Sequence, residues 1–150
     1  MSFHRVKGPL YRAKGQEALK RFICHLTGEE GFDIIFKISM KVVKKPWGKE
    51  IWFAYNRKYA GKLLYINRGH RLSLQYHKKK DETMYALKGS YLLEINGKKR
   101  KVKEGEVVHF PPKTIHRTTA KYGNVILIEV SSPELNDIVR LSDDYNRIKK

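Results

Sequence analysis

Apolar and polar residues alternate with a period of two along most of the chain from Lys45 onward. This period places successive side chains on opposite faces of an extended backbone, so it predicts short β-strands with one buried face. Asn96-Gly97, between two such segments, is typical of a two-residue hairpin turn. The predicted strands are residues 50–55, 61–67, 71–77, 83–87, 90–95, 98–103, 107–110, 116–120 and 125–131. Many short strands at this spacing indicate a mainly β protein, either a sandwich or a closed barrel.

The beginning of the chain follows a different pattern. Apolar residues at helical spacing predict a helix over residues 16–26. Residues 32–43 then alternate imperfectly, as a strand that we expect to join the main sheet. We therefore divide the chain into an N-terminal extension of residues 1–43 and a main domain of residues 44–150. In a rival interpretation, Met40 is the natural start of the protein.

The segment after the last predicted strand changes pattern again. Ser132-Pro133-Glu134 is typical of a helix N-terminus, because serine caps the first N–H groups and proline suits the first helical position. We therefore predict a short C-terminal helix from this point through about Arg140.

Four polar side chains within the β region have the spacing of a metal site. Gln75 and His77 are two residues apart in a strand-like segment, so both point to the same face. Glu82 follows after a short basic loop, and His116 follows a later turn. Two imidazoles, a carboxylate and an amide oxygen suit a divalent ion that keeps open positions for a ligand, and Zn, Mn, Fe, Co and Ni all remain open. The alternative is that these residues are ordinary polar contacts in a protein that has lost its ion.

The composition narrows the range of partners. The net charge of +17 attracts anionic metabolites and, without specificity, polyanions. Because no known DNA-binding or RNA-binding motif accompanies the basic residues, we do not expect nucleic-acid binding. No apolar run approaches the roughly 18–20 residues that cross a bilayer, and no secretory signal is visible, so we expect no membrane association. A single cysteine, Cys24, fits a reducing cytoplasm.

The motifs around the four polar residues resemble those of the cupin superfamily. Gly69, His77, Glu82 and Gly89 keep the spacing of its first motif, in which Gln75 replaces a histidine. Gly105, Pro111 and His116 keep that of the second. More closely, the chain resembles the cupin domain of type II mannose-6-phosphate isomerases. Three segments carry this likeness: Lys45-Pro46-Trp47-Gly48, residues 69–77 and residues 137–147.

This resemblance implies a fold and a function. The fold is a cupin-type antiparallel β-barrel or jelly roll, here with an N-terminal helix and a short C-terminal helix. The function is metal-dependent interconversion of mannose 6-phosphate and fructose 6-phosphate. This reaction builds negative charge on an enediolate oxygen, which a divalent ion stabilises. The resemblance also implies a homodimer.

Specific roles follow for four further residues. By resemblance, Lys80, which replaces an arginine of the family, and Arg140 are the candidate catalytic residues, and Lys80 is one candidate for the base. By strand parity, Arg71 and Ser73 share the face of Gln75 and His77 and are the candidate substrate-binding residues. A structural salt bridge is an equally open role for Arg71.

Two other functions remain open at this point. One is a non-catalytic cupin that binds a sugar or sugar nucleotide, and the other is a metal-dependent cupin dioxygenase. The Gly-rich loop of the guanylyltransferase domain to which this cupin is usually fused does not occur in the sequence, so we do not expect that activity.

Overall fold

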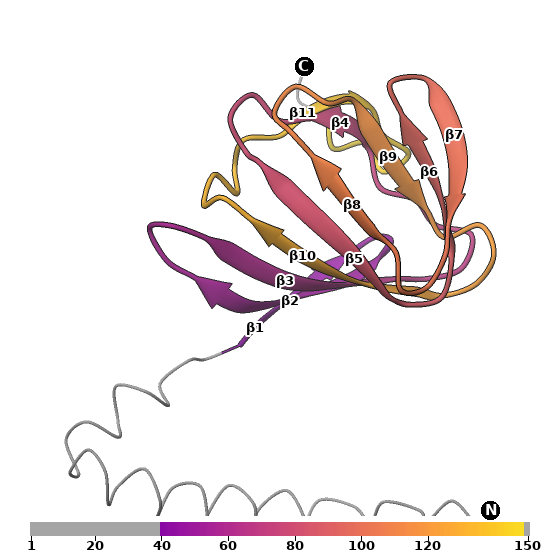
Figure 1. Cartoon of the computed structure of the whole chain (residues 1–150), viewed down its shortest axis with the longest axis horizontal. Helices are drawn as coiled ribbons and strands as arrows, with labels where there is room; N and C mark the ends of the chain where they lie inside the picture. Colours follow the sequence, from indigo (N-terminus) through magenta and orange to yellow (C-terminus); the bar gives the residue numbers. More distant parts are fainter. Residues whose placement is uncertain (1–39, 149–150) are drawn as a thin grey trace, which may run out of the picture. The chain divides into compact units, whose positions relative to one another are not determined.

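A computed structural model describes residues 40–148, which form two antiparallel β-sheets. The strands are β1 (Lys41–Lys45), β2 (Gly48–Tyr55), β3 (Ala60–Ile66), β4 (Leu74–Tyr76), β5 (Glu82–Lys88), β6 (Tyr91–Ile95), β7 (Lys98–Val102), β8 (Val107–Phe110), β9 (His116–Thr119), β10 (Val125–Ser131) and β11 (Val139–Ser142). One sheet has the order β1-β2-β3-β10-β5-β8, and the other has the order β11-β4-β9-β6-β7. Figure 1 shows the two sheets facing each other. The mainly β architecture is confirmed.

The structure describes only the last few residues of the predicted N-terminal extension. The helix predicted over residues 16–26 lies outside the described residues, as does most of the strand predicted over residues 32–43. Its last residues enter β1, which pairs with β2. The division into residues 1–43 and 44–150 therefore stays a prediction, and the six-stranded sheet begins before its boundary.

The predicted C-terminal helix is wrong in the described part of the chain. Short-range turns follow Ser132, and Val139 and Arg140 then pair with β4 as the first residues of β11. The reason is tertiary: the Asp137 carboxylate accepts hydrogen bonds from the backbone N–H groups of residues 78–80. These contacts, with sheet pairing, replace the hydrogen bonds that a helix would form.

Residues 40–148 contain no helix that could cross a membrane.

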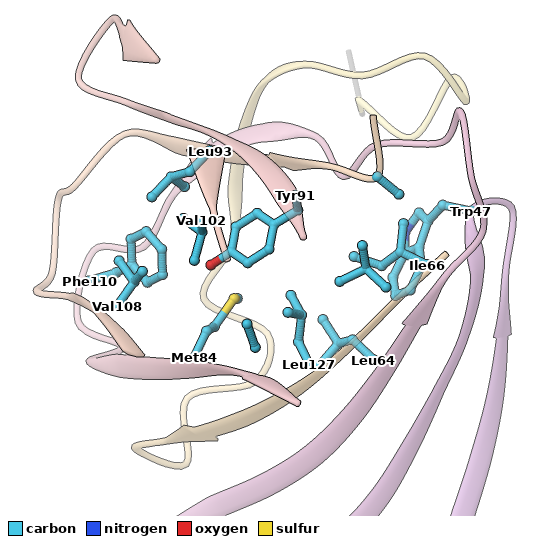
Figure 2. Close-up of a cluster of buried hydrophobic side chains, with 13 residues drawn as sticks. Trp47, Leu64, Ile66, Met84, Tyr91, Leu93, Val102, Val108, Phe110 and Leu127 are labelled. Atoms are coloured by element: carbon cyan, nitrogen blue, oxygen red, sulfur yellow. The ribbon is translucent and has the colours of Figure 1, made fainter. Parts of the chain in front are cut away.

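The apolar core lies between the sheets and follows from strand alternation. The six-stranded sheet contributes Leu64, Met84 and Leu127, and the other sheet contributes Tyr91, Leu93 and Val102. Figure 2 shows these two sets pointing toward one another. Each of the six is at most 1% exposed, so burial of apolar surface stabilises this face-to-face packing. Burial also raises the pKa of the Tyr91 hydroxyl to about 12.

The inward-facing residues become charged farther along the same strands. Next to Leu64 on the inner face of β3 is Lys62, and next to Leu127 on β10 is Glu129. Lys62 and Glu129 are directly opposite each other in the β3–β10 pairing. Glu82, the first residue of β5, is also buried. The sequence of the strands thus creates an apolar end and a charged end between the two sheets.

The backbone packs tightly at Gly48, and this close contact can be tested by substitution. Gly48 has φ +145°, and a Cβ atom added there would lie 1.9 Å from the backbone oxygen of Tyr65. We expect Gly48→Ala to lower the free energy of unfolding by roughly 3 kcal/mol, because both the backbone and the β2–β3 pairing would be strained. Chemical denaturation measures this. Gly123→Ala is the control, since an added Cβ there meets no atom of the described residues within 4 Å; equal losses for both variants would contradict the argument.

Candidate metal centre

Three of the four predicted ligands meet at the charged end of the interior. Glu82 opens β5, His116 opens β9, and His77 directly follows β4. One ligand atom from each lies within 4.8 Å of the other two, and all three side chains are buried. His116 Nε2 is 3.0 Å from Glu82 Oε1, and His77 Nε2 is 3.6 Å from the same oxygen. The strands therefore bring two imidazoles and one carboxylate to a common point.

Hydrogen bonds on the far side of each imidazole set its tautomer. His116 Nδ1 lies 3.0 Å from the backbone oxygen of Thr114, and His77 Nδ1 contacts the backbone oxygen of Asp137. A carbonyl oxygen can only accept, so both Nδ1 atoms must donate. In the neutral ring, this leaves the Nε2 lone pair of each histidine pointing at Glu82, which is the arrangement that metal-binding histidines show.

The three facing atoms fit a divalent ion. Among the residues that the structure describes, His77 Nε2, His116 Nε2 and Glu82 Oε1 are buried and have no hydrogen-bond partner. Buried polar atoms are rarely left in this state, because the loss of hydration is costly. With ligand bonds of about 2.1 Å, neighbouring ligand atoms should be roughly 3.0–3.4 Å apart, close to the two distances from Glu82 Oε1. The donor set and its spacing are therefore suited to hold a metal.

The fourth predicted ligand, Gln75, lies beside this group. It is directly opposite His116 in the β4–β9 pairing, and its side chain is buried. Its amide oxygen accepts a hydrogen bond of 2.6 Å from the Ser73 hydroxyl. Both side chains line the same cavity as His77. Ser73 therefore orients Gln75, and ligation by Gln75 stays a prediction.

Lys80 occupies the other side of Glu82. Its ammonium group lies 2.5 Å from Glu82 Oε2 and 2.7 Å from Glu129 Oε1, and Lys62 Nζ lies 3.1 Å from the same Glu129 oxygen. All four side chains are buried. They form a chain of alternating charge, Glu82–Lys80–Glu129–Lys62, which we call the buried charge chain.

This chain fixes the protonation states of Lys80 and Glu82. Burial alone would lower the pKa of Lys80, but the carboxylates of Glu129 and Glu82 raise it above its usual value. Burial alone would raise the pKa of Glu82, but the charge of the adjacent Lys80 ammonium acts to lower it. Lys80 is therefore an ammonium and Glu82 a carboxylate at neutral pH. A general base must be able to accept a proton, so this setting argues against Lys80 as the base.

A cavity of about 320 Å³ opens beside His77, the one of the three candidate ligands that lines it. Of the described residues that line it, five are cationic: Lys45, Lys62, Lys80, Arg140 and Arg147. Two are anionic: Glu50 and Glu129. The excess of positive charge makes the cavity suited to an anion.

Arg140, a candidate catalytic residue by resemblance, lines this cavity, and its catalytic role stays a prediction. It lies on β11 opposite Gln75. Burial and the nearby Arg147 lower its pKa from the usual value, against the opposing effect of Asp143 and Glu50. In the described part of the chain, its Nε is buried without a hydrogen-bond partner, and no ion pair includes it. Arg147, by contrast, binds Asp143.

Arg71 does not face the cavity. Its guanidinium forms two hydrogen bonds with Asp144, of 2.6 and 2.8 Å, and 43% of its side chain is exposed. Arg71 does not share the face of Gln75 and His77 because the predicted strand 71–77 is interrupted. Only β4, from Leu74, is regular, and Arg71 forms an isolated bridge with Thr119. Of its two open roles, the structure shows the salt bridge.

Three residues of the site were not predicted. Glu129 and Lys62 hold Lys80, and Asp137 contacts His77 through its carbonyl and residues 78–80 through its carboxylate. A signal existed for the first two, since each is a charged residue at an inward position of an otherwise apolar strand. Burial alone would raise the pKa of the Asp137 carboxyl, but the three backbone N–H groups lower it. The backbone role of Asp137 has no comparable signal.

Solved structures of similar fold define the class of protein. KdgF from Halomonas sp. is 22% identical and covers 66% of this chain and 89% of its own, with a TM-score of 0.58. An RmlC-like cupin from Shewanella frigidimarina is 17% identical and covers 68% and 91%, with a TM-score of 0.58. Streptomyces PAC13 with uridine is 15% identical and covers 71% and 90%, with a TM-score of 0.59. These likenesses concern the fold, which is that of a cupin.

Within this class, the sequence defines the family. Residues 36–143 match the family model described as mannose-6-phosphate isomerase C-terminal, and the chain belongs to that family. A mannose-1-phosphate guanylyltransferase of Salmonella montevideo is 30% identical in an alignment of 115 residues that covers 73% of this chain. The matched part is 24% of that relative, so the chain spans about a quarter of its length.

Proposed function

We propose that this cupin is a metal-dependent sugar-phosphate isomerase that interconverts mannose 6-phosphate and fructose 6-phosphate. The observation that carries the proposal is a trio of buried, facing ligand atoms, His77 Nε2, His116 Nε2 and Glu82 Oε1. His77 also lines the cationic cavity. Membership in the mannose-6-phosphate isomerase C-terminal family supports the choice of substrate.

The charges of the site favour an anionic ligand. In the buried charge chain, two lysines balance two glutamates. Lys45 balances Glu50, with 3.3 Å between Nζ and Oε1. A divalent ion held by neutral histidines would therefore add positive charge that these ion pairs do not neutralise. Arg140 adds further positive charge at the same cavity. A phosphorylated sugar supplies the negative charge that such a cavity favours.

The residues divide the work of isomerisation between them. His77, Glu82 and His116 would hold the ion, whose role as a Lewis acid is to stabilise the enediolate oxygen. Arg140 faces the cavity with a planar guanidinium that suits a phosphate. Lys80 holds its proton and donates hydrogen bonds. Among the described residues that line the cavity, Glu50 is the carboxylate outside the buried charge chain, and it is the candidate to accept a proton from carbon.

The experiment is a coupled assay of the full chain with mannose 6-phosphate and with fructose 6-phosphate, after measurement of its metal content. We expect turnover in both directions that chelation removes and a divalent ion restores. Glucose 6-phosphate and unphosphorylated mannose are the controls for sugar and phosphate. A protein that holds its ion and binds hexose phosphates without turnover would instead be a binding cupin, and oxygen uptake with bound iron would indicate a dioxygenase.

We also propose that the protein forms a homodimer through the outer face of the six-stranded sheet. Apolar side chains lie in register across all six strands: Val42, Ile51, Leu63, Ile128, Tyr85 and Val107. The end members Val42 and Val107 are each 59% exposed. The other sheet instead exposes charged side chains on β7. A second copy presents the same apolar row, and an isologous interface pairs a surface with itself.

Substitution within this row tests the dimer. We expect sedimentation velocity to give twice the chain mass of 17.6 kDa for the wild type and a single chain mass for Val107→Lys with Tyr85→Lys. Charges placed opposite their own copies across a two-fold axis repel, and their burial is costly. Lys99→Ala, on the other sheet, is expected to remain dimeric. A monomeric wild type would exclude the dimer.

A further inference from the structure

We propose that Lys80 sets how Glu82 binds the ion: it occupies one carboxylate oxygen, so that only the other is available as a ligand. The inference rests on the metal site proposed above and concerns a residue outside the ligand set. Lys80 is thus a positioning residue for the metal, held in place by Glu129.

The two oxygens of Glu82 have different surroundings. Oε1 faces the two histidine Nε2 atoms, whereas Oε2 lies 2.5 Å from the Lys80 ammonium. An ion bound by both oxygens would approach the ammonium closely, and two cations at one oxygen repel each other. The geometry therefore favours monodentate binding through Oε1.

The rest of the buried charge chain explains why Lys80 stays in place. Glu129 Oε1 accepts hydrogen bonds from both Lys80 and Lys62, and Lys62 is opposite Glu129 on the neighbouring strand. Lys80 is 4% exposed, so water does not compete for its ammonium group. Two carboxylates from different strands, β5 and β10, thus hold it from two directions.

Monodentate binding has a functional consequence. A carboxylate that uses one oxygen occupies one coordination position, whereas a bidentate carboxylate occupies two. With two histidines and one oxygen of Glu82 as ligands, a bound ion would keep more positions for oxygen atoms of a sugar than with a bidentate Glu82. Lys80 would in this way preserve the open positions that a Lewis-acid role requires.

The charge chain offers a matched pair of variants. Lys80→Met removes the cation that touches Glu82. Lys62→Met removes the same charge from the other end of the chain, where it touches Glu129 but not Glu82. Lys80→Arg keeps the charge and restores a donor to Glu82.

The experiment uses Co²⁺ as the probe, with its visible absorption and its dissociation constant measured on the full chain. For Lys80→Met we expect a weaker, blue-shifted band, as a higher coordination number gives, and about tenfold tighter binding because a nearby like charge is gone. A merely structural role would weaken binding, as loss of a partner to a metal ligand usually does. We expect Lys62→Met to keep the wild-type band and Lys80→Arg to restore it.

Several outcomes would overturn the inference. These are an unchanged band in Lys80→Met, weaker Co²⁺ binding by Lys80→Met, or an equal spectral change in Lys62→Met. If circular dichroism shows that Lys80→Met does not fold, Glu129→Gln decides: loosening Lys80 should shift the band in the same direction, and an unshifted band rejects the proposal. A wild type that binds no Co²⁺ rejects the metal site itself. A wild type that binds Co²⁺ but isomerises no sugar rejects only the isomerase, since these readouts need no turnover.

Discussion

Replacing His116 by asparagine is expected to abolish stoichiometric metal binding and to lower isomerase activity about a thousandfold. His116 supplies one of three converging ligand atoms, 3.0 Å from Glu82 Oε1, and its ring is aligned by the Thr114 carbonyl. Asparagine is uncharged and polar but too short to place a donor at the same point. Loss of a Lewis acid removes several kcal/mol of transition-state stabilisation, and about 4 kcal/mol corresponds to a thousandfold change in rate.

A second histidine provides the control for this measurement. His109 lies on β8, is 54% exposed and pairs with Asp81 at the surface. His109→Asn makes the same chemical change away from the cavity, so metal content and turnover should match those of the wild type. Metal content is measured by elemental analysis after dialysis. A His116→Asn protein that keeps one ion per chain would refute the assignment of His116 as a ligand.

Most of the strands were predictable because one of their faces is buried. The bounds predicted for β8 and β10, 107–110 and 125–131, match the structure. The Asn96-Gly97 hairpin is also confirmed: both residues have positive φ, of 47° and 80°, as a tight hairpin turn requires. Such features depend on local sequence and on a period of two, so a single sequence contains the information.

Features that depend on distant partners were harder to predict. Residues 132–140 contain a good helix start, but Asp137 bonds to the loop after β4 and β11 pairs with β4. In the predicted strand, Arg71 has the same parity as Gln75 and His77, but the strand is regular only from Leu74. In both cases a tertiary contact overrides a local preference, and no local pattern reports it.

The candidate metal centre was predictable in part from local sequence and in part only from the resemblance. Periodicity alone placed Gln75 and His77 on one face, whereas the meeting of His77 with Glu82 and His116 depends on pairing between distant strands. The resemblance to cupin motifs supplied that pairing, and the structure brings the three side chains together. Lys62 and Glu129 show what was missed: each is a lone charge on the inner face of a strand, and each is the other's partner across β3 and β10. Two isolated inward charges of opposite sign are a usable signal for such a pair.

Replacing Arg140 by alanine is expected to raise the KM for mannose 6-phosphate roughly 10- to 100-fold. Arg140 lines the cavity and is paired with Gln75 across the neighbouring strands β11 and β4. In the described residues it has no carboxylate partner, so its charge is available to a ligand. A hydrogen bond to a charged group contributes about 1.5–3 kcal/mol, which accounts for a change of this size. Because Arg140 is not among the candidate metal ligands, metal content should stay at the wild-type level.

One further variant separates the charge of Arg140 from its shape, and a second variant is the control at the surface. Arg140→Lys keeps the charge but lacks the planar fork of two donors, so it should recover only part of the loss. Arg100→Ala removes an exposed arginine that pairs with Glu106 on the surface, and it should leave KM unchanged. The steady-state KM and the inhibition constant of inorganic phosphate are measured for all three proteins. If Arg140→Ala binds inorganic phosphate as well as the wild type does, the phosphate of the substrate is held elsewhere, and Lys45 or Arg147 at the same cavity becomes the anion-binding candidate.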